Sequence, residues 1–135
     1  MIHESGQWSS SHQKWFFLPR KLSREVYDEV KDQAKCVNLI LACGDGGSDV
    51  AAATYLEPQR AHRGCSDFFF VPGTNDTHIF LIRTEETING DLATLASVID
   101  VTGAVLMEET QFAAGRKFEG CCIVPQEFTD AVKAE

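Results

Sequence analysis

The stretch Lys14-Trp15-Phe16-Phe17-Leu18-Pro19-Arg20 decides how the beginning of this chain folds. It is an aromatic and aliphatic run of the kind found in protein cores, and it ends in Pro-Arg only a few residues after Ile2-His3-Glu4-Ser5. Two such runs so close together predict one β-hairpin. The hairpin would hold the Glu4 carboxylate near the Arg20 guanidinium. Such a pairing suits a cation and a phosphate better than a plain hydrophobic core.

Short strands separated by turn residues predominate in the rest of the chain. Residues 68–71 and 78–83 predict one further hairpin, and residues 92–101 and 104–107 predict another. The turn signals are Pro72-Gly73, Asn89-Gly90 and Thr102-Gly103. The complete set of predicted strands is 14–18, 37–42, 50–55, 67–71, 78–83, 92–101, 104–107 and 117–124. Evenly spaced short strands are typical of an all-β sandwich, barrel or propeller.

One segment departs from the strand pattern. Leu22, Val26, Tyr27 and Val30 recur at helical spacing within the charged run 20–35, and Ser23 could cap a helix there. A short helix and a long polar loop are both open for this segment. The last residues, 125–135, predict a tail or a short terminal helix.

Composition and charge limit the possible partners. With 44% hydrophobic and 24% charged residues over 135 positions, the chain has ordinary globular composition. A formal net charge of −8 argues against binding to a nucleic acid polymer or an anionic membrane, since both need basic patches. No apolar run approaches the roughly 20 residues of a membrane-spanning helix, so we expect no membrane segment. No signal sequence is visible, and the abrupt beginning predicts the back part of something larger.

The five cysteines are Cys36, Cys43, Cys65, Cys121 and Cys122. They show no CxxC spacing, which argues against a structural zinc site, and their odd number argues against a complete disulfide framework. The adjacent Cys121-Cys122 pair precedes Ile123 and Val124, which predicts strand residues that face opposite sides. We expect the cysteines to be buried free thiols.

Residues 2–20 closely resemble the calcium-activated nucleotidase (apyrase) family. The resemblance rests on I-H-E-S-x-x-W-S followed by H-Q-K-W-F-F-L-P-R-K. It resumes at Gly64-Cys65-Ser66-Asp67-Phe68 and ends at Lys117-Phe118-Glu119-Gly120, so that it covers residues 1–124. It implies a five-bladed β-propeller, of which this chain would form roughly the last two blades, a partial propeller. Residues 1–124 would be the C-terminal part of the propeller domain and residues 125–135 a C-terminal tail.

The resemblance also implies an activity. The family binds Ca²⁺ in the central channel of the propeller and hydrolyses nucleoside diphosphates or triphosphates, which here would mean UDP, GDP or ADP. It implies a setting in the secretory pathway, in the lumen of the endoplasmic reticulum or Golgi, or outside the cell. It leaves room for a homodimer. Trp8 and Trp15 could stack on a base or pack between blades.

Four residues match the family's site. Glu4, Ser66 and Glu119 would be calcium ligands, because each offers the oxygen donors that calcium prefers. Arg20 would bind the substrate phosphate as a bidentate donor. Without the resemblance, Glu4 reads as a solvated carboxylate, Ser66 as a turn hydroxyl, Glu119 as an exposed strand residue, and Arg20 as a surface ion-pair partner of a residue such as Glu25. Replacing Arg20 with Ala is expected to reduce hydrolysis and leave the fold intact.

Two other interpretations stay open. The chain could be a non-catalytic truncated propeller that binds calcium weakly or pairs with another chain, because further ligands in the family come from blades that this chain lacks. Cys122 stands where the family often carries Glu, which leaves a less active copy possible. An unrelated β-sandwich binding module would explain the strand pattern but not the order of the motifs.

Overall fold

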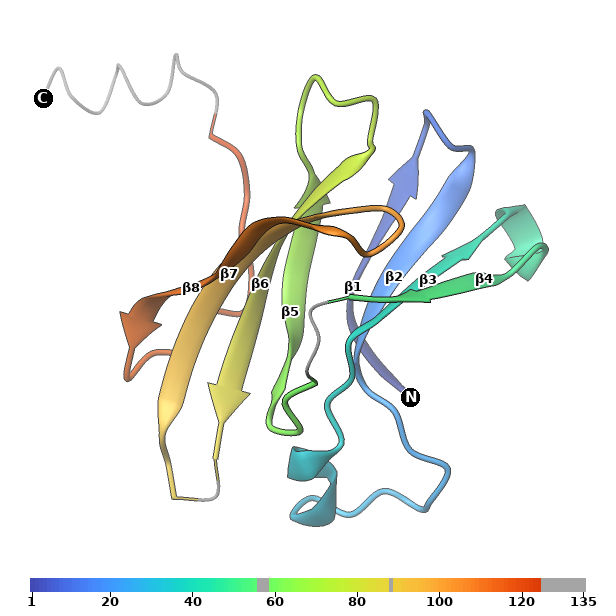
Figure 1. The fold of residues 1–135 in the computed structure, drawn as a ribbon. Helices are drawn as coiled ribbons and strands as arrows, with labels where there is room; N and C mark the ends of the chain where they lie inside the picture. Colours follow the sequence, from blue (N-terminus) through green and yellow to red (C-terminus); the bar gives the residue numbers. More distant parts are fainter. Residues whose placement is uncertain (56–58, 88, 125–135) are drawn as a thin grey trace, which may run out of the picture.

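Antiparallel strands form two four-stranded sheets in this computed structural model, which describes residues 1–55, 59–87 and 89–124 (Figure 1). The strands of the first sheet are β1 (Ile2–Ser9), β2 (Lys14–Lys21), β3 (Leu39–Cys43) and β4 (Ala51–Thr54). Those of the second are β5 (Arg63–Phe70), β6 (His78–Glu86), β7 (Leu92–Asp100) and β8 (Val105–Ala114). In each sheet every strand pairs with the next one along the chain, so both sheets are simple up-and-down meanders.

The all-β prediction and the three predicted hairpins are confirmed. β1 pairs with β2, β5 with β6 and β7 with β8, all antiparallel. β8 continues well beyond the predicted 104–107, to Ala114. The helical elements of the described chain are the 3₁₀ turns η1 (Lys31–Ala34) and η2 (Asp45–Gly47). Neither is long or apolar enough to span a membrane.

For residues 22–35 the polar loop is the correct alternative. Apart from η1 the segment has no helix, and the side chains at helical spacing are exposed, Val26 at 91% and Tyr27 at 64%. Local side-chain hydrogen bonds take the place of helical ones: the Ser23 hydroxyl accepts from the Glu25 amide at 3.0 Å, and the Asp28 carboxylate accepts from the Lys31 amide at 2.9 Å. Such bonds compete with helix formation.

The predicted strand at 117–124 is wrong. Residues 116–124 form no strand, because their backbone groups bond to side chains of the second sheet instead of to a neighbouring strand. The Thr94 hydroxyl donates to the Arg116 carbonyl at 2.8 Å, and the Asp67 carboxylate accepts from the Cys121 amide at 2.9 Å. The segment therefore folds back across the second sheet, from β7 to β5. The predicted tail at 125–135 lies outside the described residues.

The cysteines are only partly as predicted. Cys36 and Cys65 are buried free thiols, whereas Cys43 and Cys121 are partly buried and Cys122 is exposed. Because residues 116–124 form no strand, Cys121 and Cys122 do not face opposite sides of one. Burial raises the pKa of Cys121 to about 12, so this thiol stays protonated at neutral pH.

The core lies between the two sheets and follows the two-residue period of the strands. In β2, Phe16 and Leu18 point into it, while Trp15 and Phe17 point to the opposite face. Phe16 meets Phe70 of β5 edge to face, with ring centroids 5.3 Å apart. The other fully buried apolar members are Ile40, Tyr55, Cys65, Phe68, Ile79, Leu81 and Ile99. Each large apolar side chain buried here contributes about 1.5–3 kcal/mol.

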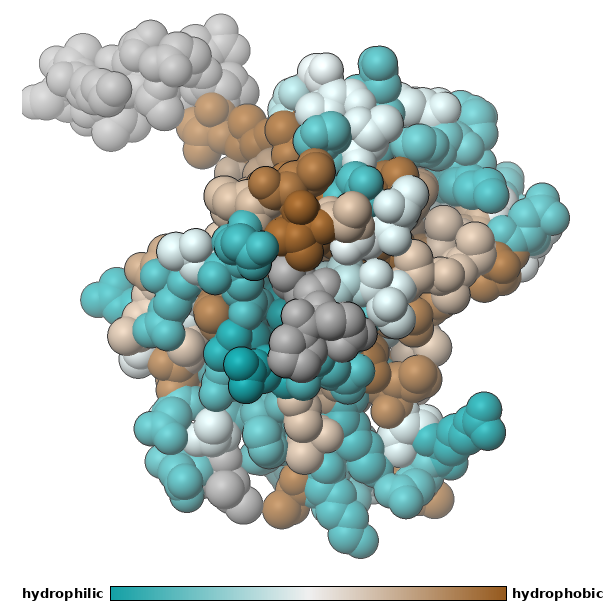
Figure 2. Space-filling model, in the orientation of Figure 1, coloured by the Kyte–Doolittle hydropathy of each residue, from teal (hydrophilic) through white to brown (hydrophobic). Residues whose placement is uncertain are grey.

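The opposite face of the first sheet is aromatic and half exposed. Trp8 and Trp15 contact each other edge to face at 5.7 Å, and Trp15 stacks on Phe17 at 6.2 Å. Trp8 and Trp15 retain 36% and 39% of their surface. Hydrophobic surface also gathers beside the last described residues of the chain (Figure 2), and Leu106 and Phe112 of β8 are exposed. Both sheets thus keep apolar surface that the described residues do not cover.

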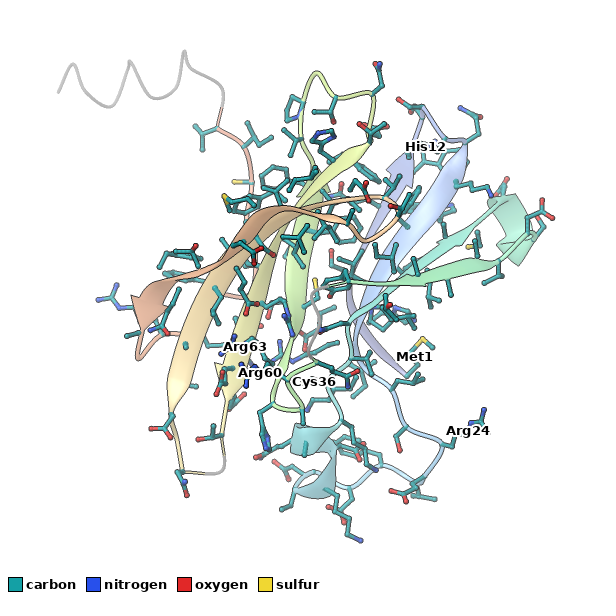
Figure 3. All side chains as sticks on the ribbon, in the orientation of Figure 1. Met1, His12, Arg24, Cys36, Arg60 and Arg63 are labelled. Atoms are coloured by element: carbon teal, nitrogen blue, oxygen red, sulfur yellow. The ribbon has the colours of Figure 1, made fainter. Side chains whose placement is uncertain are left out.

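Asp76 joins the turn between β5 and β6 to the turn between β1 and β2. Its carboxylate accepts from the Ser9 hydroxyl at 2.8 Å and from the Ser11 amide at 3.4 Å. Its carbonyl lies 3.2 Å from the His12 ring, at the tip of the β1–β2 hairpin (Figure 3). Burial alone would raise the pKa of Asp76, but the hydrogen bonds from Ser9 and Ser11 outweigh it, and the pKa is lowered.

Replacing Ser9 with Ala should therefore remove a pH-dependent contribution to stability. A carboxyl with a lowered folded-state pKa stabilises the fold above its unfolded pKa of about 3.9, and this stabilisation is lost as the pH falls through the folded-state value. We expect Ser9→Ala to lower the free energy of unfolding by about 1 kcal/mol near neutral pH, and by less near pH ~2. Urea unfolding at both pH values, with Ser10→Ala as the control, tests this. An equal loss at both would contradict it.

Candidate functional site

The Arg20 guanidinium lies at the junction of the two sheets and is only 4% exposed. Its Nη1 atom is surrounded by four oxygens from three strands. These are Ser66 Oγ and Thr84 Oγ1, each at 2.7 Å, Glu4 Oε2 at 3.2 Å and the Gly64 carbonyl at 3.4 Å. We call these four atoms the oxygen shell. The predicted proximity of the Glu4 carboxylate and the Arg20 guanidinium is confirmed.

Irregular strand pairing brings two of the predicted ligands to this place. The pairing of β1 with β2 shifts register between His3 and Gly6, the interval that contains Glu4. The pairing of β5 with β6 shifts at Ser66, which has no partner in register. A β-bulge leaves a residue unpaired and changes the direction of its side chain. Glu4 and Ser66 therefore turn toward Arg20 because each lies at an irregularity of its strand.

Gly64 allows the close approach of β2 and β5 at the shell. A Cβ atom at this position would lie 2.6 Å from Arg20 Cγ and 2.8 Å from the Arg20 carbonyl oxygen. The second distance is to backbone, which cannot swing away, so any larger residue would push the two strands apart. The requirement at Gly64 is therefore for space.

Glu119 lies outside this arrangement in the described residues. Its carboxylate pairs with Lys117 at 3.1 Å, and the same Lys117 ammonium pairs with Glu86 of β6 at 3.1 Å. The Glu119 side chain is 63% exposed, and no described contact joins it to Glu4 or Ser66. Burial alone would lower the pKa of Lys117, but its hydrogen bonds to Glu119 and Glu86 raise it, so this cation stays charged beside the shell.

Asp67 is a site residue that the sequence analysis missed. It follows Ser66 directly. Its carboxylate accepts from the Ser5 hydroxyl at 2.8 Å, from the amide of the next residue, Phe68, at 2.9 Å, and from the Cys121 amide at 2.9 Å. It thereby ties β1, β5 and the segment that carries Glu119 together. The available signal was an acidic residue inside an otherwise apolar strand. Thr84, also missed, gives no such signal.

The alternative partner for Arg20 is wrong. Glu25 pairs with Lys35 at 2.6 Å, whereas Arg20 is buried and pairs with Glu4. Glu4 itself is neither fully solvated nor fully enclosed, since 31% of its side chain remains exposed. The turn-hydroxyl interpretation of Ser66 is wrong as well, because Ser66 lies within β5 and is 1% exposed.

A second buried arginine joins the sheets on the core side of β6. Arg83 is 1% exposed and donates to Asn38 Oδ1 at 2.7 Å and to Glu109 Oε1 at 2.9 Å. Arg63 pairs with both Glu109 and Glu85. Arg63 lies near Cys36, where the two sheets meet (Figure 3). In this cluster both oxygens of Glu109 are bound by guanidinium groups. We therefore interpret the Arg83 cluster as structural, and as the counterpart of the Arg20 cluster.

The oxygen shell has the donor chemistry that calcium requires. Calcium takes six to eight oxygen ligands from carboxylates, hydroxyls, carbonyls and water, at about 2.3–2.6 Å. Glu4 supplies a carboxylate, Ser66 a hydroxyl and Gly64 a carbonyl, and together they already surround a positively charged group. Among the described residues no group of three or more His, Cys, Asp and Glu side chains is placed to hold a metal, so this shell depends on hydroxyl and carbonyl oxygens.

Comparison with known proteins identifies the family. The sequence profile of the family Apyrase matches residues 1–124. The chain is 37% identical to apyrase apy-1 of Caenorhabditis elegans over 120 residues, which cover 89% of this chain and 34% of that protein. It is 38% identical to soluble calcium-activated nucleotidase 1 of Rattus norvegicus, again over 89% of this chain but 29% of that protein. It is 37% identical to an apyrase of Cimex lectularius, of which it covers 32%.

The chain belongs to the Apyrase family. It spans about a third of the length of the curated relatives that it matches. Glu4, Ser66, Arg20 and Glu119 all lie within the matched residues.

The burial of Arg20 revises the expectation that Arg20→Ala leaves the fold intact. The substitution would remove a guanidinium from a junction of three strands and leave Glu4 without its counter-charge. Removing one partner of a buried pair costs about 3 kcal/mol or more, and the partial exposure of Glu4 reduces this to about 2 kcal/mol. Urea unfolding of Arg20→Ala against Arg24→Ala, whose side chain lies on the exposed loop (Figure 3), tests this. Equal losses would contradict a buried role.

Proposed function

We propose that this chain is part of a calcium-dependent nucleotide phosphohydrolase, a nucleoside diphosphatase or apyrase that releases phosphate from UDP, GDP or ADP. Membership of the Apyrase family supports the class of reaction, and the name of the rat relative supports dependence on calcium. The observation that carries the proposal is the oxygen shell. It is a set of oxygens from two sheets that surrounds a positive charge and leaves its carboxylate partly open to solvent.

We propose further that the two sheets are successive blades of a five-bladed propeller. Each is a four-stranded meander, and the first strands of the two meanders, β1 and β5, lie side by side where the sheets meet (Figure 1). The aromatic face of the first sheet is the surface on which a preceding blade would pack. Residues 117–124 would become a strand of a following blade, once strands from elsewhere in a longer protein offered a free edge. The threefold greater length of the relatives supports this arrangement.

The chain's residues then have definite roles. Glu4 and Ser66 would bind calcium through the oxygens that now accept from Arg20, and Glu119 would swing from Lys117 to complete the ligands that this chain supplies. Bound calcium would polarise the phosphate and orient the attacking water. Arg20 would donate to phosphate oxygens as a bidentate group and stabilise the charge that develops on them. Lys117, released from Glu119, would add positive charge beside the same substrate.

The second candidate is a non-catalytic partial propeller. Three ligands do not fill a calcium shell of six to eight, and the described contacts hold Glu119 away from Glu4. On this view the chain binds calcium weakly, or completes its site by pairing with another chain or a second copy of itself. We propose the secretory pathway or the extracellular medium as the compartment, because the calcium concentration there would fill a modest site.

Phosphate release separates these candidates. The chain and a longer form with the remaining blades should be assayed on GDP, UDP and ADP with calcium, with magnesium and with a chelator. In the active form, Glu4→Gln and Glu119→Gln should each weaken activation by calcium at least about tenfold, since each removes a charged ligand worth roughly 1.4 kcal/mol or more. Glu25→Gln, which alters an exposed loop carboxylate, is the control. Calcium activation that is unchanged in both ligand variants would remove these residues from the metal site.

A further inference from the structure

Thr84 holds Arg20 in the oxygen shell from β6. The threonine is fully buried, and its hydroxyl lies 2.7 Å from Arg20 Nη1 and 2.6 Å from Ser66 Oγ. Its carbonyl also accepts from Arg20 Nη2 at 3.4 Å. Among the described residues, Thr84 is therefore the one whose hydrogen bonds reach both terminal nitrogens of the guanidinium, Nη1 and Nη2. It also touches one of the predicted calcium ligands.

We propose that Thr84 is a positioning residue that keeps Arg20 in competition with calcium for Glu4 and Ser66. In the calcium-free chain the guanidinium takes the place of the metal. When calcium binds, Arg20 leaves the shell and becomes free to reach the substrate phosphate. The inference rests on the proposed function, because it takes Glu4 and Ser66 to be calcium ligands.

Distances place the guanidinium and a calcium ion in competition for the same two oxygens. Arg20 Nη1 lies 2.7 Å from Ser66 Oγ and 3.2 Å from Glu4 Oε2. A calcium ion bound by the same two oxygens would lie about 2.3–2.6 Å from each. An ion on the Nη1 side of these oxygens would overlap the nitrogen, and an ion on any side would repel its charge. Arg20 is only 4% exposed in the shell, so its departure would bring the guanidinium into reach of a substrate phosphate.

The shell is built so that the departure of Arg20 leaves few polar groups unsatisfied. Ser66 Oγ and Thr84 Oγ1 lie 2.6 Å apart and hydrogen-bond to each other without the guanidinium. Burying unpartnered hydroxyls would be costly, and this pairing avoids that cost. The Glu4 carboxylate, 31% exposed, would exchange a guanidinium for a divalent cation and keep a counter-charge.

Competition lowers the apparent affinity for calcium. The measured Kd equals the intrinsic Kd divided by the fraction of molecules whose ligands are free. A hydrogen bond to a charged group changes an equilibrium constant by about tenfold or more. Removing the hydroxyl that holds Arg20 should therefore raise that fraction about tenfold. The predicted change, tighter binding after loss of a polar side chain, is opposite to what simple damage to the site would cause.

Isothermal titration of calcium into the chain of residues 1–135 tests the proposal. We expect Thr84→Val to lower the Kd for calcium about tenfold and Thr84→Ser, which keeps the hydroxyl, to retain the original Kd. The matched control is Thr77→Val. Thr77 is partly buried just before β6, at the end far from Thr84, and its hydroxyl contacts the Thr74 carbonyl and the His78 ring. Its replacement should lower the melting temperature without changing the Kd.

Arg20→Gln provides a second route if Thr84→Val fails to fold. It removes the competing charge and retains an amide that can bond to Ser66 and Thr84, so the Kd should again fall. If the unaltered chain binds calcium and neither variant binds it more tightly, the competition is overturned and the calcium site stands. If neither the unaltered chain nor any variant binds calcium, the calcium site itself fails and the inference fails with it.

Discussion

The structure depends on the burial of one positive charge, the Arg20 guanidinium, between two sheets. A buried charge is tolerated only where it is paired and hydrogen-bonded. Its partners come from β1, β5 and β6, so the first sheet supplies the charge and one carboxylate while the second supplies the two hydroxyls. Satisfying Arg20 therefore fixes how the sheets sit against each other. The close approach at Gly64 and the irregular pairing at Glu4 and Ser66 both serve this requirement.

The two buried arginines differ in how fully their carboxylate partners are engaged. Arg20 lies in the second strand of the first sheet and Arg83 in the second strand of the second sheet, and each bonds to a group contributed by the other half of the chain. Both oxygens of Glu109 are engaged in the Arg83 cluster. In the Arg20 cluster the carboxylate has one engaged oxygen among the described contacts and is about one-third exposed. On the proposed function, the Arg20 cluster is the one of the two that could exchange its cation while its carboxylate kept its place.

The sequence predicted those parts of the fold that local patterns determine. The run Trp15-Phe16-Phe17-Leu18 alternates between core and outer face, and its distance from Glu4 was enough to predict the hairpin and the contact with Arg20. Helical spacing at residues 22–30 was misleading, because the apolar side chains of that segment stay exposed and the side chains of Ser23 and Asp28 bond to nearby backbone amides.

Non-local features could not be predicted in this way. Residues 117–124 have strand composition, but a strand exists only beside a free edge, and composition does not say whether one is available. The bulge at Ser66 and the position of Thr84 follow from how two strands pair across 18 residues. The same limit applies to Glu119. Its carboxylate is held by Lys117 in the described contacts, and the ligand role proposed for it depends on where the fold carries the segment.

The position of that segment connects the fold to the proposed chemistry. Asp67 follows the proposed ligand Ser66 directly, and its carboxylate accepts from the Cys121 amide. Cys121 lies two residues after Glu119, so Asp67 anchors the segment that carries this second proposed ligand. Ser5 beside Glu4 donates to the same carboxylate. Asp67 therefore binds a group that lies one or two residues from each proposed ligand. It links the three segments that carry these ligands, independently of any metal. For the proposed calcium site, such preorganisation would lower the entropic cost of assembly.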